Sequence, residues 1–227
     1  HSAAYKHVPL LEENIIEGIK NNIFGTLNLT LESISAKIDH FILISSDKAV
    51  KSTNVMGATK RCCELIVQAF ASKEKINFQP LSINGLSNVT NFKIVRFGNV
   101  IGSSGSVVPL FKKQIKRGGP ITITDERVTR YLMSIKEAAQ LVIQVANLDN
   151  NYNNKEAKLF ILDMGKPIKI VDLAKRMIQW SGLTIKNKDN IDGDIEIKKI
   201  GLRPGEKLHE ELIFNESNVI TMKNKIL

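Results

Sequence analysis

The stretch Phe41-Ile-Leu-Ile-Ser-Ser-Asp-Lys48 sets the architecture around which the rest of the chain is arranged. An apolar run that ends in polar residues is typical of a buried strand in a parallel sheet. Ligands of open α/β sheets bind beyond the carboxyl ends of the strands, where Ser46, Asp47 and Lys48 fall. The segment Asn54-Val-Met-Gly-Ala-Thr-Lys60 then begins a helix with Lys60 on its second turn. Together these two stretches predict active-site chemistry at a strand end.

The size and composition indicate a globular protein. The 227 residues, 43% of them hydrophobic, suffice for one domain with a substantial core, or for one domain and a small lobe. No apolar run reaches the roughly 18 residues of a membrane span, and no signal peptide is recognisable. The adjacent Cys62 and Cys63 cannot form a structural disulfide or a zinc site, and His7 and His209 fit no metal spacing. We therefore expect a cytoplasmic protein without a metal.

The positive charge does not indicate a nucleic-acid partner. The formal net charge is +9, but only seven of the 32 basic residues are arginine. Proteins that read nucleic acids usually concentrate arginine and aromatic residues on one face, and no such stripe is visible. A lysine-rich surface is the favoured interpretation.

Apolar periodicity alternates between strands and helices, which predicts an α/β architecture with a mostly parallel sheet. Strands are expected at 41–45, 93–97, 121–124, 159–162 and 195–200, and helices at 55–71, 107–117, 135–146 and 170–180. One or two amphipathic helices should occupy the region from Leu10 to about Lys37. Residues 72–91 are expected to be a loop, and residues 147–154 an exposed turn.

One element of a nucleotide-binding α/β fold is missing. Such proteins hold the cofactor pyrophosphate at a glycine-rich turn after the first strand. The candidate Gly102–Gly105 follows a middle strand with the wrong spacing, so a flexible substrate-side loop is favoured. We therefore expect a Rossmann-like, doubly wound parallel sheet that is truncated at its N-terminus and binds NAD(P) weakly in isolation. Residues 1–100 would be its cofactor-binding part with the active-site segment, and 101–227 mainly a small C-terminal substrate-binding lobe with returning sheet elements.

Seven ordered motifs together resemble the CapD-like polysaccharide-biosynthesis family over nearly the whole chain. They lie at 1–9, 46–50, 54–60, 96–100, 105–111, 129–131 and 201–207. Members of this family are nucleotide-sugar 4,6-dehydratases of the extended short-chain dehydrogenase/reductase superfamily, typically acting on UDP-N-acetylglucosamine. The resemblance implies NAD or NADP as cofactor, a UDP-sugar substrate and a role in surface polysaccharide or glycan synthesis. It also implies a homo-oligomer and a possible membrane tether outside this sequence.

The resemblance assigns the acid–base chemistry to the stretch that follows the first strand. A hydride would leave C4 of the sugar for the cofactor, and a base would then remove the C5 proton while an acid protonates the departing 6-hydroxyl. Asp47 and Lys48 match the acid–base pair, Ser46 matches the hydroxyl that bonds the 4-oxygen, and Lys60 would bind the nicotinamide ribose. Because neighbours in a strand point to opposite faces, Asp47 and Lys48 can serve one substrate only if the backbone has left strand geometry.

Met56 departs from the superfamily pattern Tyr-x-x-x-Lys. Methionine cannot exchange a proton, so another group must take the proton of the sugar 4-hydroxyl, or Met56 is simply a packing residue. The long, membrane-tethered branch of these dehydratases looks similar in carrying methionine at this position.

The resemblance also implies a set of ligand contacts. Arg130 and Arg203 are expected to bind the UDP diphosphate, because a guanidinium fork suits its oxygens, whereas Arg96 could be structural. The backbone at Ala3 and Ala4 would approach the cofactor. The remaining substrate contacts would come from Lys6, Asn99, Ser106, Val107, Pro109 and Glu206.

Two alternatives to the dehydratase remain open. A nucleotide-sugar 4-epimerase needs no C5 base and would usually keep the tyrosine. A truncated, non-catalytic sugar-nucleotide-binding module would keep the substrate contacts without the cofactor half.

Overall fold

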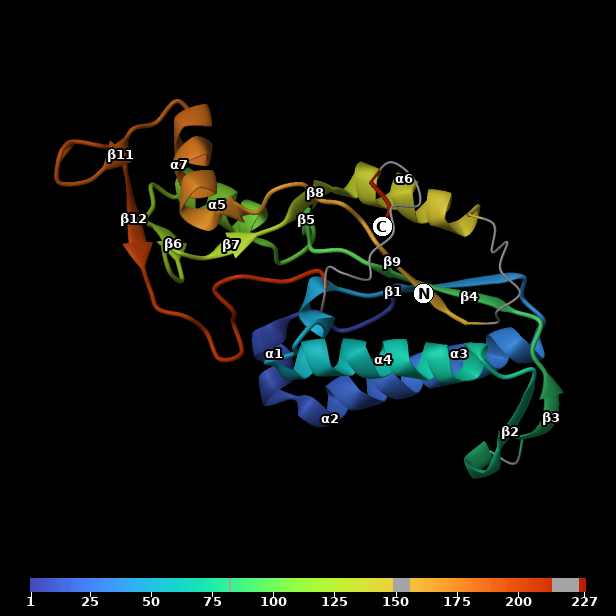
Figure 1. The fold of residues 1–227 in the computed structure, drawn as a ribbon. Helices are drawn as coiled ribbons and strands as arrows, with labels where there is room; N and C mark the ends of the chain where they lie inside the picture. Colours follow the sequence, from blue (N-terminus) through green and yellow to red (C-terminus); the bar gives the residue numbers. More distant parts are fainter. Residues whose placement is uncertain (82, 149–155, 214–224) are drawn as a thin grey trace. The chain divides into compact units, whose positions relative to one another are not determined.

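The fold is taken from a computed structural model, which describes residues 1–81, 83–148, 156–213 and 225–227 (Figure 1). The chain divides into two compact units. Unit 1 comprises His1–Phe97, Ala139–Asp163 and Glu211–Leu227, and unit 2 comprises Gly98–Ala138 and Met164–Glu210. Each unit has its own apolar core, and each is described by itself.

Unit 1 is organised on a parallel sheet in the order β1-β4-β9. These strands are β1 (His40–Ile44), β4 (Asn91–Arg96) and β9 (Lys158–Ile161). The central strand β4 is buried from Phe92 to Arg96, so its residues face protein on both sides of the sheet. This is the pattern of a parallel strand covered on both faces, as the apolar runs of the sequence predicted.

Helices cover both faces of this sheet (Figure 1). On one face lie α3 (Gly25–Ser35) and α4 (Val55–Ala71), whose apolar residues join the strands in a common core. On the other face lies α6 (Ile135–Ala146). The fully buried Lys93 of β4 donates from Nζ to the carbonyls of Val145, Ala146 and Leu148 at 2.7–2.9 Å. Lys93 thereby pairs with carbonyl groups at and just beyond the C-terminal end of α6, where intrahelical partners run out. The doubly wound fold class is confirmed.

The N-terminal helical region differs in detail from the expected one or two amphipathic helices. The structure contains α1 (Val8–Glu13) and α2 (Ile15–Gly18), followed by a π-helical segment, η1 (Ile19–Phe24), which continues into α3. The π-helical segment carries Asn22, whose polar side chain is fully buried. Such segments are rare, are frequent at functional sites, and leave no trace in simple apolar periodicity.

The prediction of a loop over residues 72–91 was wrong. The strands β2 (Lys75–Phe78) and β3 (Ile83–Ser87) form an antiparallel hairpin, with the short helix η3 (Gln79–Leu81) between them. Ile76 is buried, and Phe78, Ile83 and Leu86 pack against the same core. Polar residues alternate with these apolar ones, so a half-buried two-stranded hairpin was mistaken for a polar loop.

Unit 2 has a smaller parallel sheet in the order β11-β12-β6. Its strands are β11 (Ile185–Lys186), β12 (Ile195–Lys199) and β6 (Ile121–Ile123). The helices α5 (Val107–Lys116) and α7 (Ile170–Trp180) share one core with β6 and β12. These four elements lie where the sequence predicted them.

Short strands complete unit 2. β5 (Asn99–Ile101) pairs in parallel with β8 (Leu132–Ser134), and β7 (Thr129–Arg130) pairs antiparallel with β10 (Ile168–Lys169). The sequence analysis did not predict these four strands, which have only two or three residues each. Most of the expected turn at 147–154 lies outside the described residues. None of the helices in the described part of the chain has the length and apolar character needed to cross a membrane.

Candidate active site

The backbone leaves strand geometry directly after β1. Ser45 N still donates to Val95 O at 2.7 Å, but Asp47–Ala49 form one turn of 3-10 helix, η2. Ser46 caps this turn, because its Oγ accepts from Lys48 N at 3.3 Å. The departure from strand geometry that the sequence argument required for Asp47 and Lys48 is confirmed.

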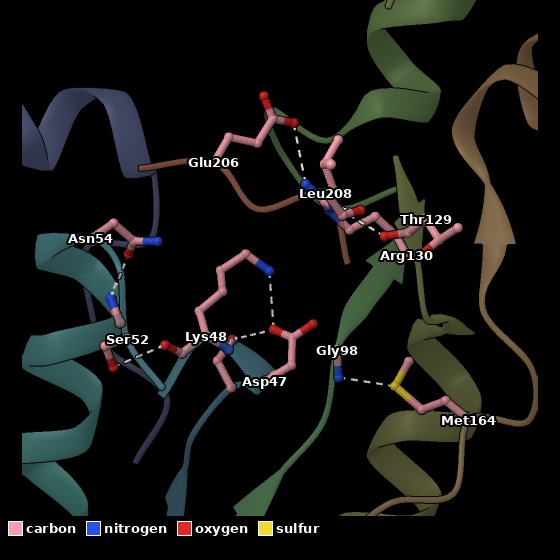
Figure 2. A network of polar contacts seen from close by, with 12 residues as sticks. Asp47, Lys48, Ser52, Asn54, Gly98, Thr129, Arg130, Met164, Glu206 and Leu208 are labelled. Atoms are coloured by element: carbon pink, nitrogen blue, oxygen red, sulfur yellow. Dashed lines mark hydrogen bonds and ion pairs between the residues drawn. The ribbon is translucent and has the colours of Figure 1, made fainter. Parts of the chain in front are cut away.

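Asp47 is fully buried, and its two carboxylate oxygens differ in their hydrogen bonding. Its Oδ1 accepts from Ser46 Oγ at 2.8 Å and from Lys48 Nζ at 3.0 Å (Figure 2). Its Oδ2 is buried and has no hydrogen-bond partner among the described residues. Buried polar atoms are almost always paired, so an unpaired carboxylate oxygen needs an explanation. A ligand hydroxyl, or a proton to be transferred, would satisfy it.

Gly57 holds η2 against the N-terminal end of α4. A Cβ atom at this position would overlap with the carbonyl oxygen of Lys48, so no other residue fits here without a shift of the backbone. Asn54 caps α4 by accepting from Gly57 N at 2.8 Å (Figure 2). Glycine at position 57 therefore lets the turn that carries Lys48 lie directly on the helix that carries Met56 and Lys60.

Met56 and Lys60 both face the protein interior. Met56 is buried, and Lys60 donates from Nζ to the carbonyl oxygen of Ile44 at the end of β1. Burial lowers the pKa of Lys60. Interactions with Cys63 and Glu64 raise this pKa and offset part of the effect of burial. A lone lysine on a helix usually extends into solvent, whereas Lys60 is buried and hydrogen-bonded.

This lowered pKa gives a pH-dependent stability that can be measured. Between the lowered pKa of Lys60 in the folded chain and about 10.5 in the unfolded chain, the unfolded state binds more protons. This group therefore makes the free energy of unfolding rise with pH across that window. We expect Lys60→Met to remove the rise, as measured by urea unfolding between neutral pH and about pH 10. The exposed Lys112→Met is the control, and an unchanged pH slope in Lys60→Met would contradict the assignment.

The N-terminal segment is tied to the helices by Asn22. Asn22 Oδ1 accepts from Tyr5 N at 2.7 Å, and Nδ2 donates to Tyr5 O and to Thr59 Oγ1, both at 3.0 Å. The amide thus pairs with both backbone groups of Tyr5 and holds Ala3 and Ala4 in place; Ala3 is exposed and Ala4 half-buried. Sequence reasoning missed Asn22, although a polar residue between Ile19 and Ile23 in an apolar helical stripe could have signalled it.

Glu64 is a second residue that sequence reasoning missed. It is fully buried and accepts from Arg96 Nη2 at 2.7 Å, from Arg96 Nε at 3.1 Å and from Ser45 Oγ at 2.6 Å. Arg61 also donates to Glu64, and Arg96 donates to the carbonyl of Leu212. This network joins α4 to the ends of β1 and β4. These contacts give Arg96 a structural role, which the sequence analysis had offered as the alternative to a contact with the diphosphate.

In unit 2, several expected substrate contacts gather around β5 and the start of α5. Asn99 begins β5 and Ser106 is the N-cap of α5, with Val107 half-buried and Pro109 exposed in the first turn. Asn99 Oδ1 and Ser106 Oγ are buried atoms without a hydrogen-bond partner in the described part of the chain. Like Asp47 Oδ2, these atoms lack the partner that buried polar atoms almost always have.

The two expected diphosphate arginines have different surroundings. Arg130 is buried and donates to Glu206 Oε1 at 3.2 Å, to Thr129 O at 2.7 Å and to Leu208 O at 3.2 Å (Figure 2). Arg203 is exposed. Lys6, the remaining expected substrate contact, is also exposed and belongs to unit 1. The structure thus groups Arg130 with Glu206 and leaves the Arg203 side chain accessible.

The parallel sheet with helices on both faces, and the polar residues that follow β1, define a Rossmann-type α/β fold. The family described as "Polysaccharide biosynthesis protein" matches residues 1–227. The chain belongs to this family, as the sequence motifs indicated.

Curated relatives place the chain among polysaccharide-biosynthesis and nucleotide-sugar proteins. Capsular polysaccharide biosynthesis protein CapD of Staphylococcus aureus is 48% identical over 94% of this chain and 31% of its own length. A UDP-N-acetylglucosamine 4,6-dehydratase (inverting) of Campylobacter jejuni is 33% identical over 97% of this chain and 57% of its own length. A UDP-glucose 4-epimerase of Rickettsia rickettsii is 34% identical over 95% of this chain and 55% of its own length. The chain spans less than two thirds of each relative.

A solved structure supports the fold. The X-ray structure of Pen from Bacillus thuringiensis is 36% identical and superposes with a TM-score of 0.78, covering 93% of this chain and 58% of that one. The fold and the family are therefore shown by sequence and by structure together.

Proposed function

We propose that this chain forms part of a nucleotide-sugar 4,6-dehydratase acting on a UDP-N-acetylglucosamine-like substrate in surface polysaccharide or glycan synthesis. The observation that carries the proposal is the η2 turn, where a buried carboxylate with one unpaired oxygen contacts the ammonium of the next residue. The likeness to the Campylobacter jejuni dehydratase supports the same reading.

The two residues of this turn have complementary roles in the proposed reaction. Lys48 Nζ, in its neutral form, takes the proton from C5 of the sugar. Asp47, through Oδ2, gives a proton to the departing 6-hydroxyl, so the C6–O bond breaks and water leaves as the C5–C6 double bond forms. Ser46 Oγ bonds the 4-oxygen of the sugar. The contact between Lys48 Nζ and Asp47 Oδ1 keeps the two groups within reach of neighbouring carbons and lets the carboxylate stabilise the ammonium that forms.

The residues of unit 1 fit part of a dinucleotide cofactor. Lys60, buried at the end of β1, would bond the nicotinamide ribose, and the backbone at Ala3 and Ala4, held through Asn22, would lie along it. The described residues include no glycine-rich strand–turn–helix for the pyrophosphate. NAD or NADP supplies the oxidation at C4 and the return of the hydride at C6.

Product analysis tests the reaction class. In a chain that includes a cofactor-binding half, a 4,6-dehydratase converts UDP-N-acetylglucosamine to a 4-keto-6-deoxy sugar and exchanges the C5 proton with solvent. The product is identified by NMR in deuterium oxide. A 4-epimer without deuterium at C5 would instead indicate the alternative that the Rickettsia rickettsii relative favours. A chain that binds UDP and forms neither product would be the non-catalytic module.

We expect Arg203 to contact the UDP diphosphate, because its guanidinium is exposed. Arg203→Ala should weaken UDP binding by about 10- to 100-fold while the fold stays intact, since a charge-assisted hydrogen bond contributes roughly 1.5–3 kcal/mol. Calorimetric titration with UDP measures the effect. Arg176→Ala, which removes another exposed arginine of unit 2, is the matched control. Equal UDP affinity in Arg203→Ala and in the unchanged chain would show that the diphosphate lies elsewhere.

A further inference from the structure

The structure assigns a positioning role to Glu206, and this inference deepens the proposed function on which it rests. We propose that its carboxylate holds the segment Gly201–Lys207 in the conformation that presents Arg203 to the nucleotide diphosphate. The resemblance to the family placed Glu206 among the substrate contacts. The hydrogen bonds of the structure support a positioning role for it.

Both oxygens of Glu206 are used by donors of unit 2. Oε2 accepts from the main-chain N–H of Arg203 at 3.2 Å. Oε1 accepts from Thr124 Oγ1 at 3.0 Å. It also accepts from Arg130 Nη2 at 3.2 Å (Figure 2). One carboxylate therefore joins the segment that carries Arg203 to the residue after β6 and to β7. Its negative charge also disfavours direct contact with a diphosphate, which is itself an anion.

The two ends of the segment are anchored independently of Glu206. At its start, Ile200 N donates to Ile123 O at 2.9 Å. At its end, Thr129 N donates to Leu208 O at 2.9 Å, and Arg130 Nη1 donates to the same carbonyl at 3.2 Å. Between these anchors, the Glu206 carboxylate connects the segment to Thr124 and to Arg130.

The segment needs such a restraint because of its composition. Gly201 and Gly205 have positive φ values of 90° and 72°, which suit glycine and add conformational freedom to the unfolded segment. Glu206 N donates to Arg203 O at 3.0 Å, which closes a turn between the two residues. The turn and the carboxylate together fix the backbone of Arg203. A fixed backbone spares a ligand part of the entropy of ordering the segment.

A double-mutant cycle tests this role through the affinity for UDP. We expect Glu206→Ala to weaken UDP binding by about 10-fold, because Arg203 loses its position. If Glu206 acts through Arg203, the double variant Glu206→Ala/Arg203→Ala should bind UDP no more weakly than Arg203→Ala alone. Asp194→Ala is the matched control, because Asp194 accepts from Thr184 N and Oγ1 in unit 2 but has no contact with the segment among the hydrogen bonds of the structure. Additive losses, or an unchanged affinity in Glu206→Ala, would overturn the inference.

Hydrogen exchange without a ligand provides a second readout. Glu206→Ala should speed amide exchange in peptides covering 201–207 relative to the unchanged chain and to Asp194→Ala. Glu206→Gln, which keeps the shape but not the charge, should show a smaller increase, and it replaces the alanine variant if that variant unfolds. Unaltered exchange in both variants would overturn the inference. If the unchanged chain does not bind UDP, the proposed function fails and this inference with it, whereas UDP binding that is insensitive to Glu206 refutes this inference alone.

Discussion

Replacing Lys48 by methionine should abolish both solvent deuterium exchange at C5 of the sugar and the loss of water. The physical reason is that methionine has a similar length but cannot accept a proton, so the C5–H bond has no base. General acid–base groups contribute about 10²- to 10⁴-fold to rate, so the loss should be large. The measurement uses a chain that includes a cofactor-binding half, with UDP-N-acetylglucosamine in deuterium oxide. Oxidation at C4, seen as absorbance of the reduced cofactor, should persist.

Asp47→Asn separates the two roles within the same turn. Asparagine keeps the shape of the side chain but cannot give a proton to the leaving hydroxyl. Water loss should therefore fall more than C5 exchange does, since Lys48 is retained. Lys51→Met is the matched control, because Lys51 is an exposed lysine just beyond the same turn and pairs with Glu211. Near-normal deuterium exchange at C5 in Lys48→Met would show that the base is another residue.

Removal of the Glu64 carboxylate should strongly destabilise unit 1. Glu64→Ala leaves Arg96 as a buried charge without its carboxylate partner, which typically costs about 3–5 kcal/mol of unfolding free energy. Urea unfolding followed by circular dichroism measures the loss. The exposed Glu32→Ala should change stability by only a few tenths of a kcal/mol.

A paired replacement tests the physical reason for that loss. In Glu64→Leu/Arg96→Met neither charge is buried alone, so this variant should be more stable than Glu64→Ala. Arg61 and Ser45, which also bond Glu64, lose a partner in both variants and do not affect the comparison. If Glu64→Ala cost less than about 1 kcal/mol, the network would not be the link between α4 and the strand ends that its geometry indicates.

Local patterns were sufficient for the main helices and strands. The apolar run at 41–44 and the helical period at 55–71 are signals within one segment, and the structure places β1 and α4 there. The roles that the resemblance implied for Asp47 and Lys48 required a break in strand geometry, and the structure shows η2 at that point. Local patterns failed where the signal was short or mixed, as in the β2–β3 hairpin, and where the helix type changed, as in η1.

The fold class, the family and the segments that carry the candidate site could be predicted from the sequence, because apolar periodicity and ordered motifs are properties of neighbouring residues. Which polar groups are paired became visible only in the folded chain. Glu64 meets Arg96 across 32 residues and Glu206 meets Thr124 across 82, and no local pattern encodes such contacts. The same holds for the unpaired oxygen of Asp47 and for the different surroundings of Arg130 and Arg203. Burial and hydrogen bonding depend on what the whole chain brings to a position, and these properties separate a positioning residue from one that can contact a ligand.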